Sequence, residues 1–305
     1  MIRAESVTKK FGNFEAVSNL SCEIPKGCIY GLIGANGAGK STFLRLVTGV
    51  YKPDGGSVLL DGERTYENPG AKRRMAYVPD ELFFPAGASM NRMASMYSSM
   101  HKDFDRVRHQ ELTDLFRLNP KVSTNTFSKG MRRQAATIFA LCCRPEYIFF
   151  DETFDGLDPI VRNVVKNLIT EYVMERGTTA IITSHSLREL EDTCDQLALL
   201  YKGGIVFESD VQDLKTALFK VQIAFSDEYD MERFAGLELK DYTQRGSVAN
   251  FIVRGDRDQV RARLMEQAPV LLDILPLSLE EVFIHEMQAI GYAFDNILGE
   301  ESDNV

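Results

Sequence analysis

FSKGMRRQAATIFALCCRPEYIFFDETFDGLDP, residues 127–159, is the stretch that decides the fold of this chain. It begins with a Ser-Lys-Gly turn that opens an apolar helix, and it continues into a short strand, Tyr147–Phe150. Asp151 and Glu152 follow at the carboxyl end of that strand, and in parallel sheets ligands bind at the carboxyl ends of the strands. The pattern predicts an α/β protein with a polar site at the sheet edge. The alternative is that an acidic pair simply ends the strand.

A glycine-rich loop earlier in the chain indicates which ligand this site binds. Residues 34–41, GANGAGKS, match GxxxxGK[ST], between a predicted strand, Cys28–Ile33, and a predicted helix, Lys40–Val47. Such a P-loop wraps backbone N–H groups around phosphates at a helix N-terminus. A chance glycine-rich turn is the alternative. We expect the nucleotide to contact Gly34, Ala35, Asn36, Gly37, Ala38, Gly39, Lys40, Ser41 and Thr42.

The two motifs together predict a nucleotide triphosphatase. Lys40 would reach the β and γ phosphates, and the Ser41 hydroxyl would bind Mg²⁺ together with Asp151. Glu152 would orient the attacking water and take its proton, a role worth about 10²- to 10⁴-fold in rate.

The 305 residues are expected to form one large and one smaller domain. Residues 1–209 alternate strands and helices, with a helical subdomain set in at about 85–145. Residues 210–289 follow the β-α-β-β-α-β order of ferredoxin-like domains, and residues 290–305 form a tail. Ser186 and Glu189 have the spacing of a capping box at a helix start.

The composition disfavours several classes of partner and site. With 35 Lys and Arg against 44 Asp and Glu, the net charge of −9 disfavours general binding to nucleic acid. The five cysteines form no CxxC pair, which favours reduced thiols in a cytosolic protein over disulfides or zinc. The N-terminal residues have no apolar core of a signal peptide, and no apolar run approaches a membrane span of about 20 residues.

FSKGM, residues 127–131, resembles the signature motif of ATP-binding-cassette (ABC) ATPases, commonly LSGGQ. Ser128, Lys129 and Gly130 would form a second phosphate-binding helix start. In this family the second cradle serves the ATP held by the opposite copy. The resemblance therefore implies a head-to-tail dimer, most simply of identical copies. A bare helix cap is the alternative.

The resemblance extends over about residues 2–209 and implies further site residues. Phe11 takes the place of the ring that stacks on adenine, although it could be a packed loop aromatic. The loop containing Asp158 resembles the one that crosses the dimer interface. His185 matches the switch histidine at the γ-phosphate, whereas a lone histidine is usually structural. We thus take Lys40, Glu152 and His185 as the catalytic candidates.

Several positions depart from the family pattern. Asp80 stands where the Q-loop usually has a glutamine, and it could still ligate Mg²⁺ or water, so the metal-ligating candidates are Ser41, Asp151 and Asp80. Lys129 replaces a glycine of the signature motif, either adding charge near the partner's phosphates or remaining solvated. Met131 and Thr153 replace a glutamine and a proline.

LEEVF, residues 279–283, together with the SKGM signature and Asp80, resembles the ABC-2 export branch. The resemblance implies an ATPase subunit that uses ATP and Mg²⁺ to drive export through a separate transmembrane permease, at the cytoplasmic face of the membrane. Phe83, Phe84 and a methionine stripe at residues 90–100 would suit a groove for that permease, although such stripes are most often core. An ABC importer ATPase and a non-transport ABC ATPase remain as alternatives.

Overall fold

The computed structural model describes residues 1–289 of the chain. They divide into two units, Met1–Glu208 and a second unit that begins at Ser209, and each is considered by itself. The tail expected at residues 290–305 lies outside the described residues.

A six-stranded sheet forms the centre of the first unit, in the order β10-β9-β3-β8-β7-β6. Its strands β3, β7 and β8 are buried along their whole length, as expected of parallel strands covered on both faces. The parallel register sets Ile33 at the end of β3 beside Ser184 of β8, and Asp151 at the end of β7 beside Thr183. The carboxyl ends of β3, β8 and β7 therefore lie in a row. The strands are β3 (Ile29–Ile33), β6 (Met75–Val78), β7 (Tyr147–Asp151), β8 (Thr179–Ser184), β9 (Gln196–Tyr201) and β10 (Gly204–Asp210).

A smaller antiparallel sheet, in the order β2-β1-β4-β5, completes the strands of this unit. Helix α1 (Lys40–Val47) packs against β7 of the large sheet and against β1, β2 and β4 of the small one. Phe43 and Leu44 of α1 are fully buried, and burial of each such side chain contributes about 1.5–3 kcal/mol. The core thus holds α1, and with it the glycine loop, in place. The strands are β1 (Ile2–Phe11), β2 (Phe14–Ile24), β4 (Gly55–Leu60) and β5 (Glu63–Arg64).

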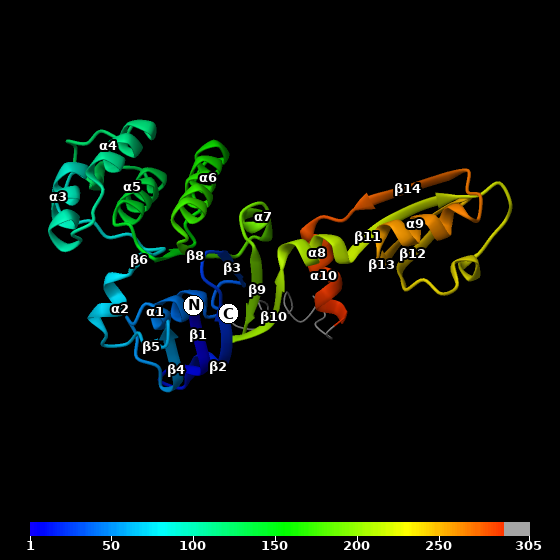
Figure 1. The fold of residues 1–305 in the computed structure, drawn as a ribbon, viewed down its shortest axis with the longest axis horizontal. Helices are drawn as coiled ribbons and strands as arrows, with labels where there is room; N and C mark the ends of the chain where they lie inside the picture. Colours follow the sequence, from blue (N-terminus) through cyan, green and yellow to red (C-terminus); the bar gives the residue numbers. More distant parts are fainter. Residues whose placement is uncertain (290–305) are drawn as a thin grey trace, which may run out of the picture. The chain divides into compact units, whose positions relative to one another are not determined.

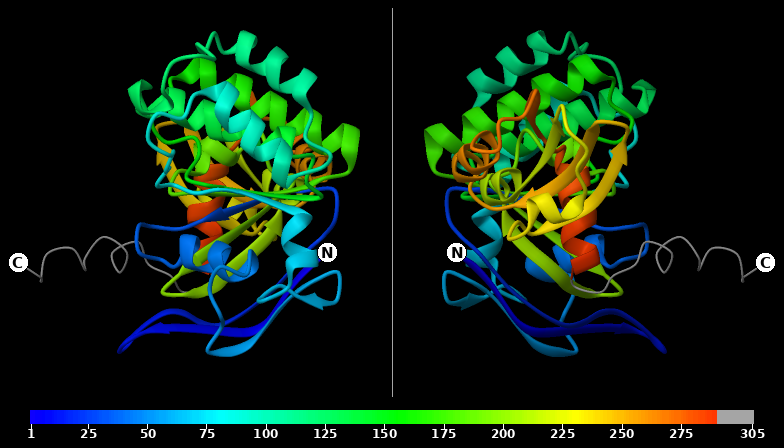
Figure 2. Two further views of the ribbon diagram at one scale, coloured as in Figure 1. Left: turned by 90° about the vertical axis from the view of Figure 1, so that its left-hand side faces the viewer. Right: turned by 90° about the vertical axis from the view of Figure 1, so that its right-hand side faces the viewer.

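Helices α3, α4 and α5 gather on the side of the large sheet away from the antiparallel sheet, as the views in Figures 1 and 2 agree. Met90 and Met93 of α3 are buried, whereas Met96 and Met100 are exposed, so the methionine stripe divides between core and surface. Within residues 1–289, every helix is too short or too polar to cross a membrane. The helices of the unit are α2 (Pro69–Arg73), α3 (Met90–Met100), α4 (Arg106–Leu115), η1 (Thr124–Thr126), α5 (Lys129–Cys142), α6 (Pro159–Arg176) and α7 (Leu187–Leu190).

The second unit is an antiparallel sheet in the order β12-β13-β11-β14, with helix α9 (Arg257–Met265) between its last two strands in the chain. This is the ferredoxin-like arrangement predicted from the sequence. The first helix of the expected β-α-β-β-α-β order is a single 3-10 turn, η2 (Met231–Phe234), that buries Phe234 against Phe251. The remaining elements are α8 (Val211–Ala217), β11 (Leu218–Ala224), β12 (Leu239–Arg245), β13 (Val248–Arg254), β14 (Leu271–Pro276) and α10 (Leu279–Ala289).

Candidate functional site: a phosphate loop and its carboxylates

The glycine loop joins the end of β3 to the first residue of α1. Gly39, directly before the helix, has φ +108°, and a Cβ there would lie 2.4 Å from the carbonyl oxygen of Ala16. Only glycine fits this close approach and this backbone conformation. The loop therefore presents its amides at the N-terminus of α1, a geometry that favours phosphate groups.

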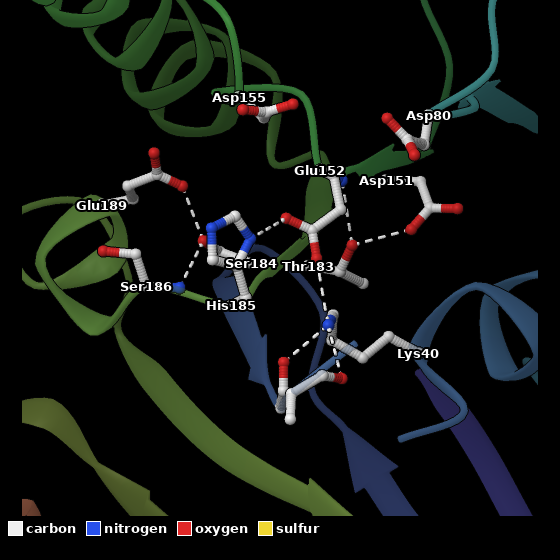
Figure 3. Close-up of polar contacts among 12 residues, drawn as sticks. Lys40, Asp80, Asp151, Glu152, Asp155, Thr183, Ser184, His185, Ser186 and Glu189 are labelled. Carbon is white, nitrogen blue, oxygen red and sulfur yellow. Dashed lines mark hydrogen bonds and ion pairs between the residues drawn. The ribbon is translucent and has the colours of Figure 1, made fainter. Parts of the chain in front are cut away.

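Lys40 reaches back over this loop from the first position of α1 (Figure 3). Its Nζ donates to the carbonyl oxygens of Gly34 at 2.6 Å and Ala35 at 3.2 Å, and it lies 3.0 Å from Oε1 of Glu152. The side chain is only 5% exposed. A buried ammonium needs such partners to offset its desolvation. The loop carbonyls and Glu152 therefore fix the position of the Lys40 ammonium.

Glu152 lies between Lys40 and His185. Its Oε2 is 2.9 Å from Nδ1 of His185, and its backbone N–H donates to Oγ1 of Thr183 at 3.0 Å. Glu152 has φ +48°, a conformation that costs free energy for a residue other than glycine and that clusters at functional sites. Figure 3 shows the carboxylate pointing toward both Lys40 and His185.

Asp151 is fully buried, and three hydroxyl groups fix its carboxylate. Ser41 and Thr183 donate to Oδ1 at 3.0 and 2.8 Å, and Tyr77 donates to Oδ2 at 3.0 Å. Burial, and then the charge of Asp151, raise the pKa of Tyr77. The phenol therefore stays protonated and remains a donor.

The oxygens of Ser41 and Asp151 fit a magnesium ion. Within residues 1–289, His, Cys, Asp and Glu side chains do not gather in threes that could hold a metal by themselves. Mg²⁺ in nucleotide sites commonly takes one or two protein oxygens and completes its shell with phosphates and water. The hydroxyl and carboxylate here are hard oxygen donors, 3.0 Å apart, beside the phosphate loop.

Thr183 and Tyr77 are the site residues that sequence reasoning missed. Thr183 lies opposite Asp151 in the β7–β8 register, and Tyr77 comes from β6, which pairs with β7 on its other side. Their place beside Asp151 depends on the strand order β6-β7-β8, which the local sequence does not reveal.

A second group of predicted residues lies around the start of α5. Ser128 is the N-cap of α5, and its Oγ accepts from the N–H of Met131 at 3.2 Å. Lys129 is exposed, and its Nζ lies 2.7 Å from Oδ2 of Asp155 in the same chain. It is therefore solvated at the surface and also ion-paired. A Cβ on Gly130 would lie 3.1 Å from the Gly156 carbonyl oxygen, so α5 starts close against the loop after β7.

The other candidates have defined local partners. Asp80 forms an ion pair with Arg133 rather than standing free. Asp158 caps α6, where its Oδ1 accepts from the N–H groups of Ile160 and Val161. Phe11 is 45% exposed and meets Tyr51 edge to face, at 5.4 Å between ring centroids, so a large part of the ring is free for contact.

The capping box expected at Ser186 and Glu189 is wrong. Glu189 instead accepts from the Ser184 hydroxyl at 2.6 Å and pairs with Arg162 at 3.3 Å. The N–H of Ser186 is satisfied by Oγ of Ser184 at 2.9 Å. Because Ser184 and Arg162 occupy the carboxylate of Glu189, it does not reach back to the helix start.

Comparisons with known proteins identify the family of this chain. A family model described as ABC transporter matches residues 17–155. The Nod factor export ATP-binding protein I of Rhizobium etli is 30% identical over 287 residues, which cover 91% of this chain and 90% of that protein. The chain belongs to the ATP-binding proteins of ABC transporters. Proteins of this family are ATPases, and the P-loop and the Asp151–Glu152 pair agree with that chemistry.

Other ABC relatives extend along nearly the whole chain. The ABC transporter ATP-binding protein YtrB of Bacillus subtilis is 28% identical over 285 residues, 93% of this chain and 97% of that protein. Among solved structures, an ATP-binding subunit of an ABC transporter has a TM-score of 0.64 at 22% identity, covering 70% of this chain and 92% of that one. A dimeric post-hydrolysis cassette, MJ0796 with ADP and Pi, has a TM-score of 0.62 at 21% identity, covering 69% and 99%. These structures establish the ABC cassette fold for the first unit.

Proposed function

We propose that this ABC protein is the nucleotide-binding subunit of an exporter, which hydrolyses ATP with Mg²⁺ in a head-to-tail dimer and drives transport through a separate transmembrane subunit. The observation that carries the proposal is the continuous contact from Lys40 through Glu152 to His185. The side chain proposed to act as base for water thus contacts both the lysine proposed for the phosphates and the histidine proposed to hold the base in place.

The binding of ATP is the first step. The amides of residues 34–39 and the start of α1 would surround the phosphates, and Thr42 would add its hydroxyl. Lys40 would leave Glu152 for the β and γ phosphates, because their negative charge exceeds that of one carboxylate. Phe11 would stack on the adenine through its exposed face.

Hydrolysis is the second step. Ser41 and Asp151 would hold Mg²⁺, with Asp80 as a further candidate, and the bound ion supplies charge that offsets the charge building up on the phosphates. Glu152, released by Lys40, would orient a water and accept its proton. His185 would keep the carboxylate of Glu152 in place and contact the γ-phosphate.

The dimer is supported by the exposed start of α5. Ser128, Lys129 and Gly130 lie at the N-terminus of a 14-residue helix, which favours an anion. The loop ending at Asp158 lies against Gly130 through Gly156. In a head-to-tail pair, both segments would face the nucleotide of the second copy, as the family resemblance implies.

A groove beside the helical region supports a membrane partner. A cavity of about 330 Å³ lies between β6 and α5, and Phe83 at its edge is 86% exposed. An amphipathic helix of a transmembrane subunit would fit such a groove, which would place the protein at the cytoplasmic face of the membrane. The cavity is lined by Tyr77, Phe83, Phe84, Tyr97, His101 and other residues.

The export direction is supported by the names of the relatives. They include the Nod factor export protein and a probable multidrug ABC transporter protein, YbhF of Escherichia coli, which is 29% identical over 221 residues, 70% of this chain but only 38% of that protein. An importer ATPase and a non-transport ABC ATPase are the competing functions.

Affinity purification of a tagged full-length chain from detergent-solubilised native membranes tests the proposal. We expect a polytopic membrane protein to be recovered in stoichiometric amount with the chain carrying an intact Phe83. The Phe83→Asp variant should recover much less of it, with unchanged ATP hydrolysis in the absence of the partner. Co-sedimentation with ribosomes, and no membrane partner, would instead favour the non-transport function.

A further inference from the structure

Arg133 is a fully buried arginine on α5 that lies between two loops of the nucleotide site. Its Nη2 is 2.6 Å from Oδ1 of Asp80 and 3.7 Å from Oδ2 of Asp155. Arginine is almost never fully buried without ionic partners, because desolvation of the guanidinium is costly. The two aspartates are therefore what keeps this charge in the interior.

The two aspartates come from different segments of the site. Asp80 follows β6, and Asp155 follows β7 in the loop that also carries Glu152. In Figure 3 both carboxylates lie on the side of Glu152 opposite to Lys40. Arg133 thus contacts the segment of a proposed metal ligand and the segment of the proposed catalytic base at the same time.

Two cations, Arg133 and Lys129, pair with two carboxylates, those of Asp80 and Asp155, at unequal distances. Lys129, at the start of the same helix, is 2.7 Å from Oδ2 of Asp155, and this hydrogen bond holds the pKa of Asp155 below its usual value. Nε and Nη1 of Arg133 have no hydrogen-bond partner among residues 1–289. The guanidinium therefore has donors available for a carboxylate that moves closer.

We propose that Arg133 is a positioning residue that couples the place of Asp80 to the place of the loop around Asp155. The proposal rests on the ATP site proposed above. When Asp80 moves toward the bound nucleotide, the buried guanidinium loses its nearest partner and draws Asp155 closer. Loss of one partner of a buried charge is strongly unfavourable, and this cost links the two loops.

A purely structural role would be different in kind. If Arg133 only fixed α5 to the core, its removal would lower stability, but each loop would still respond to nucleotide. The distinguishing measurement is the response of one loop when the link to the other is removed. Hydrogen–deuterium exchange of residues 79–84 and 153–158 gives this readout in the full-length chain without turnover.

The experiment compares exchange with and without the non-hydrolysable analogue AMP-PNP and Mg²⁺ in the wild-type chain, Arg133→Gln and Asp80→Asn. The double variant Asp80→Asn with Arg133→Gln removes the charge together with its partner, and it serves if the single arginine variant does not fold. Arg132→Gln is the matched control, because Arg132 is the neighbouring arginine of α5 and its Nε donates to the Phe127 carbonyl.

In the wild type and in Arg132→Gln we expect AMP-PNP to change exchange in both segments. In Arg133→Gln and in the double variant, the analogue should bind within about threefold of wild-type affinity, while the response of residues 153–158 is lost. In Asp80→Asn, too, the response of 153–158 should be lost. Turnover in Arg133→Gln should fall about tenfold, in the range found for coupled residues.

A full response of residues 153–158 in the variants without Arg133 would overturn the inference and leave the proposed ATP site intact. If the wild-type chain failed to bind AMP-PNP, the proposed ATP site would be wrong, and the inference would be overturned with it. Binding of the analogue by the wild type therefore separates the two failures.

Discussion

Lys40 and Glu152 form an ion pair, with Nζ 3.0 Å from Oε1 and with the two side chains only 5% and 12% exposed. The same lysine is proposed to bind the phosphates of ATP, and the same carboxylate is proposed to act on water. Each group therefore holds the other until nucleotide arrives. On this proposal, ATP would break the pair, and its binding would be tied to the release of the Glu152 carboxylate.

Glu152→Gln should bind ATP at least as tightly as the wild type and lose turnover. The amide leaves Lys40 without a competing negative charge, but it cannot accept the proton of the attacking water. We expect turnover to fall by about 10²- to 10⁴-fold. Equilibrium binding of a fluorescent ATP analogue and phosphate release measure the two effects.

The same variant also tests the dimer. Because hydrolysis no longer removes the bound ATP, Glu152→Gln should accumulate as a dimer with ATP in size-exclusion chromatography, and Lys40→Ala should remain a monomer under the same conditions. Turnover of Glu152→Gln equal to that of the wild type would show that the base is another residue.

The sequence alone predicted those parts of the site whose residues are neighbours along the chain. The P-loop and the Asp151–Glu152 pair lie in contiguous segments, so their spacing alone indicates their chemistry. Contacts made across the fold could not be foreseen in this way. Arg133 and Asp80 are separated by 53 positions in the chain, and their pairing depends on how α5 packs beside β6.

Competition between polar groups explains why the predicted capping box does not form. Ser186 and Glu189 have the spacing of a capping box, yet the carboxylate of Glu189 contacts Ser184 and Arg162 instead. Local spacing states what a side chain can reach, whereas the folded chain decides which partner it takes.

Asp151→Asn should lose both magnesium-dependent hydrolysis and stability. Asp151 is fully buried and accepts from three hydroxyls, whereas an asparagine offers one acceptor oxygen and places its NH₂ against donors. An unsatisfied buried group costs about 1–3 kcal/mol, which thermal or urea unfolding would detect.

Tyr77→Phe is the matched control for this change. It removes the contact of the phenol to Oδ2 of Asp151 and its interaction with Arg45, and it leaves Ser41 and Thr183 in place. We expect a smaller loss, about 0.5–1.5 kcal/mol, with magnesium-dependent hydrolysis retained. Equal losses in the two variants would contradict the importance given to the carboxylate itself.

Gly39→Ala should disrupt the phosphate loop more than Gly37→Ala. Both glycines have positive φ, +108° and +81°, so alanine is strained at either position. At Gly39 the new Cβ would also meet the Ala16 carbonyl oxygen at 2.4 Å, whereas at Gly37 no atom lies within 4 Å. Backbone strain of this kind costs about 1–3 kcal/mol, and the clash adds to it at Gly39 alone.

The measurement is the melting temperature of each variant, together with its affinity for the fluorescent ATP analogue. We expect Gly37→Ala to fold with a modest loss of affinity and Gly39→Ala to lose stability and binding together. The opposite order would mean that the loop adopts another path when it holds phosphate.

The thiols, four of them buried and that of Cys28 partly buried, should resist alkylation at neutral pH. All five cysteines are free, and burial raises the pKa of Cys28 to about 11 and those of Cys22 and Cys143 to about 12. Since only the thiolate reacts, iodoacetamide should modify the native protein slowly at pH 7.5 and much faster in guanidinium.

The pH dependence follows from the same shifts. A thiol whose pKa is raised by folding stabilises the native state fully below its unfolded pKa, about 8.5. This contribution is lost as the pH rises from there toward 11–12, so the free energy of unfolding should fall over that range. The rate of native alkylation should rise about tenfold per pH unit up to pH 10, because the thiols stay below their pKa. A thiol that reacts rapidly at pH 7.5 in the folded chain, located by mass spectrometry, would contradict this account of its surroundings.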